Sequence, residues 1–252
     1  DTSSPFGTWT ELPYLQAMVC VTGDGRYQWM LDKKLEVAPQ YRAFEHNRQV
    51  EPVEPKDLDG TQIFPVDPLY HASNKGNSHL PLRKTFDKVV FRDGFDPANQ
   101  YLFLDGLSNG GHKHYDGNSI CRLTQNHRIW LADCDYIKSL PKFHNGVLIF
   151  KNGQSAEIPP FAELERSADF DLTGFSETTL RNYSGVNWHR NILWTRGEFF
   201  VVVDEMEALS EADYSFRAVW QTLGNVELGE GGMAVEQNGE RFFIKGLDNT
   251  KL

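Results

Sequence analysis

The stretch Asn191–Val203, NILWTRGEFFVVV, decides the fold class. A short apolar segment ends in Trp194, the polar or small residues TRGE follow, and the chain continues as the run FFVVV. β-Branched and aromatic residues on both sides of a short turn that contains glycine are typical of successive β-strands. The stretch therefore predicts two strands separated by a tight turn.

The same texture extends over residues 81–252. Short runs rich in Val, Ile, Phe and Tyr alternate with turn signals such as Gln237–Glu240. Many strands with turns at short intervals predict a sandwich or a barrel. We expect a mainly β, antiparallel β-sandwich that is incomplete at its C-terminus, because the chain ends soon after the last predicted strand. The predicted strands are 89–91, 100–104, 119–123, 128–131, 146–150, 191–194, 199–203, 214–220 and 241–245.

The first third of the chain has a different pattern. Residues 8–34 show apolar positions at helical spacing on both sides of the break TGDG at 22–25, which predicts two paired helices. One such pair cannot bury both of its faces, so we expect residues 1–47 to be the end of a larger helical domain. Residues 48–80 are punctuated by prolines and polar runs, which favours a linker.

Composition excludes several classes of protein. The 252 residues carry a formal net charge of −10, and 40% of them are hydrophobic. No apolar run approaches the length that spans a bilayer, so we expect no membrane span. The hydrophobic fraction is too high for a disordered chain, and the absence of a Lys/Arg cluster argues against nucleic-acid binding. Three cysteines make no disulfide framework.

One segment carries the chemistry: GGHKHYDGNS at residues 110–119. In an extended backbone His112 and His114 point to the same side, because side chains alternate with a period of two. Asp133 follows a predicted strand, and His144 precedes the next one. Histidines and a carboxylate gathered from neighbouring strand ends predict a Zn²⁺ site. The alternative is that these are ordinary polar residues at the ends of a sheet.

These motifs resemble a known family. The block 111–119, the segment WLAD at 130–133 and the pair His144–Asn145 are similar to the β-sandwich region of heparinase II/III-like polysaccharide lyases. The segment FDKVVFRDG at 86–94 resembles the opening strand of that sandwich, and the resemblance covers roughly residues 60–220. It implies an antiparallel β-sandwich preceded by a short helical remnant of an (α/α) toroid.

The resemblance also implies roles. His114, Asp133 and His144 match the zinc ligands of the family, and His112 matches a histidine that faces the substrate cleft. The implied activity is β-elimination on a uronate-containing acidic polysaccharide, with a structural zinc and a periplasmic or secreted location. The other catalytic residues of the toroid lie upstream of this chain, so we expect this fragment alone to be inactive.

The sequence also offers weaker candidates for functional roles. Tyr115 and Tyr136 are candidates for the general acid, and Asp135 competes with Asp133 as a metal ligand. Trp188 is a candidate for stacking on a sugar and Arg190 for pairing with a carboxylate. The more ordinary role for each of these side chains is packing or a solvated surface.

Two other functions stay open. One is a non-catalytic carbohydrate-binding or structural sandwich that retains the zinc site. The other is a metal-dependent hydrolase that uses the same ligands. The sequence does not identify the glycan, and it leaves a homo-oligomer possible.

Overall fold

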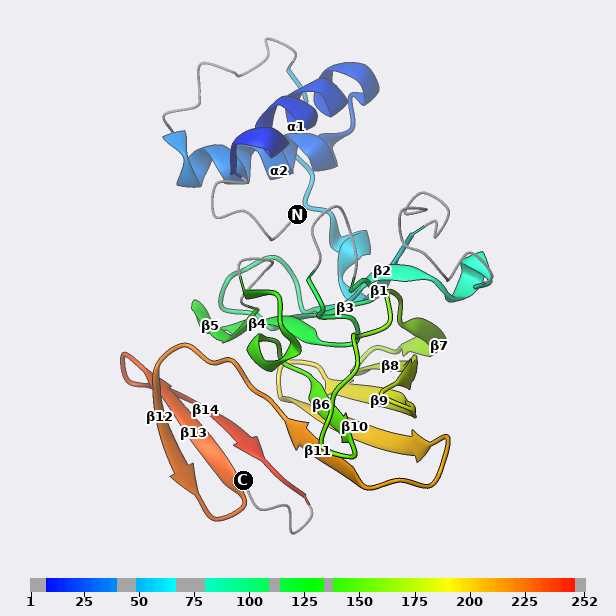
Figure 1. The fold of residues 1–252 in the computed structure, drawn as a ribbon. Helices are drawn as coiled ribbons and strands as arrows, with labels where there is room; N and C mark the ends of the chain where they lie inside the picture. Colours follow the sequence, from blue (N-terminus) through cyan, green and yellow to red (C-terminus); the bar gives the residue numbers. More distant parts are fainter. Residues whose placement is uncertain (1–7, 40–48, 67–79, 109–113, 134–137, 248–252) are drawn as a thin grey trace. The chain divides into compact units, whose positions relative to one another are not determined.

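The computed structural model describes residues 8–39, 49–66, 80–108, 114–133 and 138–247. The chain divides into two compact units, Asp1–Leu58 and Asp59–Leu252. Figure 1 shows the helices of the first unit in blue and the strands of the second from cyan to red. None of the described helices is both long and apolar enough to cross a membrane.

The first unit contains the predicted helix pair. Helix α1 is Thr8–Thr22 and helix α2 is Gly25–Val37. Asp24 caps α2, because its side chain accepts a hydrogen bond from the backbone N–H of Arg26 at 2.9 Å. The two helices pack through a small apolar cluster, which confirms the predicted pair; its buried members are Leu12, Leu15, Leu31 and Leu35.

The second unit is built on two large antiparallel sheets. The first has the order β1-β2-β3-β4-β5 and the second the order β10-β9-β8-β7. The strands of the first are β1 (Gly60–Pro65), β2 (Phe86–Arg92), β3 (Tyr101–Asp105), β4 (Ile120–Gln125) and β5 (Arg128–Ala132). Those of the second are β7 (Glu163–Asp169), β8 (Thr173–Tyr183), β9 (Val186–Thr195) and β10 (Phe199–Ala208).

Two smaller sheets complete the second unit. One pairs β6 (Val147–Lys151) with β11 (Tyr214–Ala218). The other has the order β12-β13-β14, from β12 (Asn225–Gly229), β13 (Gly232–Gln237) and β14 (Glu240–Lys245). The described residues also form short 3₁₀ helices: η2 (Lys56–Leu58) at the end of the first unit, and η3 (Leu82–Lys84) and η5 (Pro141–Phe143) in the second.

The core lies between the two large sheets. Apolar side chains of β2 to β5 meet side chains of β8 and β9 in one continuous buried cluster. This is the arrangement of a β-sandwich, in which the two inner faces supply alternate residues of each strand. The predicted fold class is thereby confirmed. The largest fully buried side chains of the cluster are Trp188, Trp194, Tyr183, Phe86 and Phe91.

One strand occupies a range where the sequence predicts a linker. Residues 60–65 form β1, which pairs antiparallel with β2. The backbone N–H of Thr61 also donates a hydrogen bond of 2.7 Å to the Asp169 side chain at the end of β7. The linker 48–80 therefore contains an element of the sandwich, because β1 finds its hydrogen-bond partners in β2, between 21 and 32 residues later.

Candidate metal centre

Three buried or half-buried side chains meet where the loops flanking β4, β5 and β6 come together. Asp116 lies in the loop before β4, Asp133 directly follows β5, and His144 lies between η5 and β6. One potential ligand atom from each lies within 4.8 Å of those of the other two. The structure therefore brings together Asp133 and His144, two of the three metal ligands predicted from the sequence.

His144 and Asp133 form a close pair. Nδ1 of His144 lies 2.8 and 2.9 Å from the two carboxylate oxygens of Asp133. The imidazole is fully buried, whereas the Asp133 side chain is 12% exposed. Burial lowers the pKa of His144, but the hydrogen bond and the negative charge of Asp133 outweigh it, so the pKa is raised.

His114, the third predicted ligand, contacts the cluster through Asp116. Nδ1 of His114 lies 3.6 Å from Oδ2 of Asp116. Their loop is tied back on Ser108, whose hydroxyl accepts the N–H of Gly117 at 2.9 Å. Tyr115, between them, has a left-handed backbone with φ of 57°. The extended backbone is therefore interrupted between His114 and Asp116.

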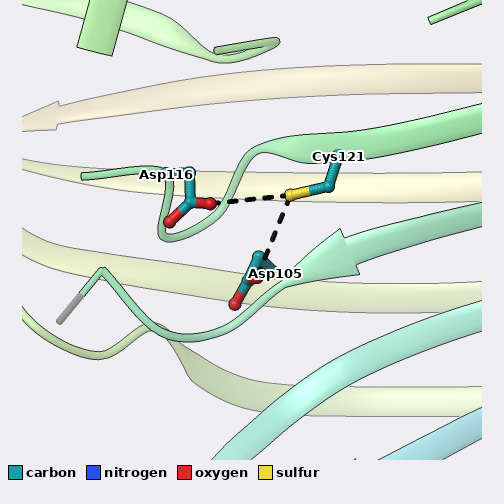
Figure 2. A group of neighbouring side chains, drawn as sticks. All are labelled: Asp105, Asp116 and Cys121. Carbon is teal, nitrogen blue, oxygen red and sulfur yellow. Dashed lines mark hydrogen bonds between the residues drawn. The ribbon is translucent and has the colours of Figure 1, made fainter. Parts of the chain in front are cut away.

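A second group shares Asp116. The thiol of Cys121, on β4, lies 3.8 Å from Oδ2 of Asp116 and 3.9 Å from Oδ2 of Asp105 at the end of β3, as Figure 2 shows. Burial and the nearby Asp116 charge raise the pKa of Asp105 well above its usual range. Burial also raises the pKa of the Cys121 thiol, with Asp133 adding to the effect. Ionising Asp105 and Cys121 in this buried space is therefore unfavourable, although the Lys88 ammonium, 3.9 Å from Oδ2 of Asp105, partly counters the effect.

The donor set fits a zinc ion. Among the residues that the structure describes, Nε2 of His144 and Oδ1 of Asp116 are buried without a hydrogen-bond partner. A buried carboxylate oxygen or imidazole nitrogen without a partner is costly, unless a proton or a cation compensates it. Imidazole and carboxylate are ordinary zinc ligands. A zinc ion bound at Oδ1 of Asp116 or at Nε2 of His144 would give that atom a partner.

Asp116 is the member of this cluster that the sequence analysis did not assign. Its signal was present, because it lies two residues after His114, as His114 does after His112. In a fully extended segment a period of two would place all three on one side, although the left-handed backbone of Tyr115 interrupts that alternation here. Cys121 and Asp105 offered no such signal, since only the pairing of β3 with β4 brings them to Asp116.

Several predicted residues lie outside the described part of the chain: His112, Asp135 and Tyr136. Tyr115 is described, and its hydroxyl donates a hydrogen bond of 3.0 Å to Glu157. Its ring packs against the edge of the core. Its role as a general acid stays a prediction.

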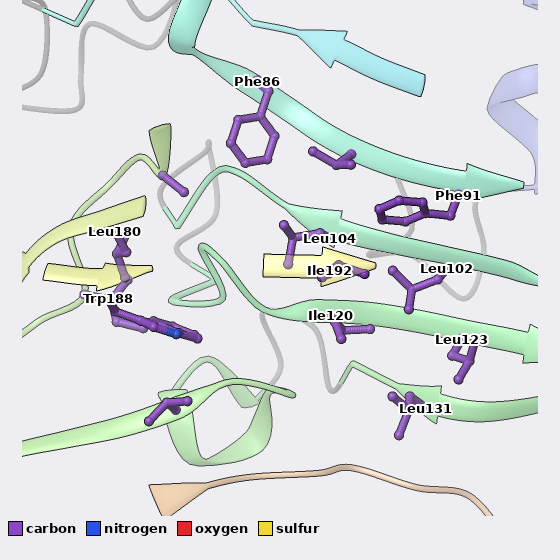
Figure 3. Packing of buried hydrophobic residues seen from close by; sticks show 14 of the residues in the cluster. Phe86, Phe91, Leu102, Leu104, Ile120, Leu123, Leu131, Leu180, Trp188 and Ile192 are labelled. Atoms are coloured by element: carbon purple, nitrogen blue, oxygen red, sulfur yellow. The ribbon is translucent and has the colours of Figure 1, made fainter. Parts of the chain in front are cut away.

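The predicted substrate-binding roles of Trp188 and Arg190 are corrected by the structure. Both side chains, predicted to contact a sugar, are fully buried on β9, and Figure 3 shows Trp188 inside the apolar core. Asp204, the register partner of Arg190 on β10, accepts hydrogen bonds from both, at 2.8 Å from each. Neither side chain is available to a polysaccharide, because alternation along β9 turns this face inward.

Comparison with solved structures finds this fold in polysaccharide lyases. Heparan sulfate lyase HepC from Pedobacter heparinus matches with a TM-score of 0.67 and 10% identity, over 97% of this chain and 35% of that chain. A crystal structure titled heparinase III matches with a TM-score of 0.59 and 15% identity, over 89% and 33%. A second heparinase III structure gives 0.65 and 10%, over 94% and 34%.

The resemblance first drawn from the sequence motifs is thus confirmed at the level of the fold. The chain spans about a third of the length of these lyases. No protein-family model matches it, and the search of curated proteins finds no match.

Proposed function

We propose that this chain is the zinc-stabilised sandwich part of a polysaccharide lyase that cleaves a uronate-containing acidic glycan by β-elimination. The observation that carries the proposal is the buried cluster of Asp116, Asp133 and His144, with one orphaned atom on His144 and one on Asp116. The fold shared with heparan sulfate lyases supports the substrate class.

The chemistry requires three groups. A base removes the proton at C5, a positive or hydrogen-bonding group neutralises the uronate carboxylate, and an acid protonates the glycosidic oxygen. His112 is our candidate for proton transfer, because imidazole titrates near neutral pH. Ligation of His114, two residues later, would hold the loop that carries His112. Tyr115 is a second, weaker candidate for the acid.

We propose that the zinc is structural and that it cross-links the loops that carry its ligands. His144 and Asp116 are 0% and 2% exposed. A catalytic zinc keeps a position open to water or substrate, whereas a structural one is enclosed by its protein ligands. The burial of these two ligands therefore favours the lyase over a metal-dependent hydrolase.

The first test is zinc content. We expect about one zinc per chain by elemental analysis of the full-length protein, as a single closed site requires. His144→Ala should remove it, since the variant lacks the buried imidazole. His127→Ala is the matched control, because His127 is exposed in the turn between β4 and β5 and is not a member of the cluster. Metal-free wild-type protein, purified without chelators and offered zinc, would contradict the ligand set.

The second test is the reaction. The full-length protein should release unsaturated uronates, detected by their ultraviolet absorbance, from at least one acidic polysaccharide. His112→Ala should lower kcat/KM by about 10²- to 10⁴-fold, the usual contribution of a general acid or base, whereas His127→Ala should not. Saturated products would instead identify a hydrolase. Binding without any product would identify a carbohydrate-binding module.

The proposed substrate also suggests where the protein acts. Acidic polysaccharides of this kind are polymers found outside the cytoplasm, so we propose a periplasmic or secreted enzyme. Its partner is the polysaccharide itself, and self-association is a further possibility that analytical ultracentrifugation would test.

A further inference from the structure

We infer that Arg190 is a positioning residue for the metal centre: a buried guanidinium that holds together the two loops carrying Asp116 and His144. The inference depends on the proposed zinc site and extends it to a residue remote from the ligands in sequence. It gives a role to a fully buried side chain.

The guanidinium is anchored on the second sheet. Arg190 lies on β9 between its register partners Thr178 on β8 and Asp204 on β10. Its Nε and Nη2 donate to the two oxygens of Asp204 at 2.8 and 2.9 Å. This two-point contact compensates the buried charge and fixes the plane of the group.

The remaining nitrogen reaches both loops. Nη1 of Arg190 donates to the backbone carbonyls of Asn118 at 2.9 Å and Asn145 at 3.1 Å. Asn118 is two residues after Asp116, and Asn145 directly follows His144. A single terminal nitrogen with two hydrogens therefore links the backbone next to one buried candidate ligand to the backbone next to the other. The separation of these ligands is thus set in part by Arg190.

Two asparagine side chains extend the linkage. Nδ2 of Asn145 donates to the carbonyl of Ala132 at 3.4 Å, beside Asp133, and to the carbonyl of Ile120 at 2.8 Å. The Asn118 side chain accepts a hydrogen bond of 2.6 Å from the Thr178 hydroxyl. All three segments that supply the cluster are therefore tied to one another or to β8 and β9.

Lysine cannot reproduce this contact. The guanidinium presents five N–H groups in a rigid fork, of which at least four are used here, two toward Asp204 and two toward the loops. Lysine retains the charge but offers three donors from one nitrogen. Arg190→Lys therefore removes the geometry while preserving the charge that balances Asp204.

The test measures zinc affinity and local backbone exchange in the full-length protein. Arg190→Lys should weaken zinc binding by about 10- to 100-fold, as expected for a residue that orients ligands. Hydrogen–deuterium exchange should accelerate in residues 114–119 and 144–146 together. Arg166→Lys is the matched control, because it makes the same change in an ion pair with Glu177 where the Arg166 side chain is 77% exposed; its zinc affinity should equal that of wild type.

Each arm has an outcome that overturns the inference. Wild-type zinc affinity and unchanged loop exchange in Arg190→Lys would do so, as would acceleration spread evenly over the sandwich. If wild-type protein binds no zinc, the metal proposal fails while the exchange measurement still decides the positioning role. If Arg190→Lys does not fold, Asp204→Asn replaces it. This change loosens the anchor of the guanidinium and should accelerate exchange in 114–119 and 144–146 together; acceleration in one loop alone would contradict the linkage.

Discussion

Trp188→Ala is expected to destabilise the sandwich by about 3 to 5 kcal/mol, the range for removing a large aromatic side chain from a core. Trp188 is fully buried between the two large sheets and is among the largest side chains of the core. The substitution removes its packing and leaves a cavity that the rigid strands cannot fill. Urea unfolding followed by circular dichroism measures the change in the free energy of unfolding.

Leu193→Ala is the matched control for Trp188→Ala. Leu193 is on the same strand, β9, but its side chain is 43% exposed. Substitutions at such positions usually change stability by no more than about 0.5 kcal/mol. If Trp188→Ala kept wild-type stability but lost affinity for a polysaccharide, Trp188 would belong to a binding surface and its assignment to the core would be wrong.

Asp204→Ala is expected to cost a similar amount, about 3 to 5 kcal/mol, through a different mechanism. The Arg190 side chain is 1% exposed and relies on Asp204 for its counter-ion. Removing the carboxylate leaves a buried charge without its partner, and the indole N–H of Trp188 also loses its acceptor. The measurement is again the free energy of unfolding.

Glu205→Ala controls for the loss of a carboxylate on β10, because Glu205 is the next residue and is exposed. It should leave stability nearly unchanged. A double variant, Arg190→Met with Asp204→Ala, separates charge from packing. It should be less destabilised than the sum of the two single changes, since no unpaired charge remains. Strict additivity would show that the two residues do not act as a pair.

The hairpin and several other strands could be predicted because their signals are local. The stretch 191–203 forms the end of β9, a turn and the start of β10, with Phe199 paired to Thr195. β8, the longest strand, was not predicted. Its inward face carries hydroxyls such as Ser176 and Thr178, which are fully buried. The partner of Thr178 is Asn118, sixty residues away, so no local pattern reveals that this face is interior.

The candidate site also has features that local sequence patterns indicate and others that depend on contacts between distant segments. The spacing of His112 and His114 and the placement of Asp133 and His144 at strand ends indicated a metal site from the sequence. The same reasoning misassigned Trp188 and Arg190, because an arginine beside an aromatic residue is typical of a binding surface. Both side chains are instead buried and hydrogen-bonded to Asp204 on β10. Nothing in the sequence of 187–190 indicates that Asp204 pairs with this segment.

The hydrogen bonds of Arg190 also bear on the order in which the molecule folds. Its two carbonyl acceptors lie 72 and 45 residues earlier in the chain. Contacts between such distant segments form only after the entropy of closing long loops has been overcome, that is, once the two sheets have docked. We therefore expect the candidate metal centre to form late in folding. A zinc ion bound there would chiefly slow unfolding, because it would stabilise a sandwich that has already formed.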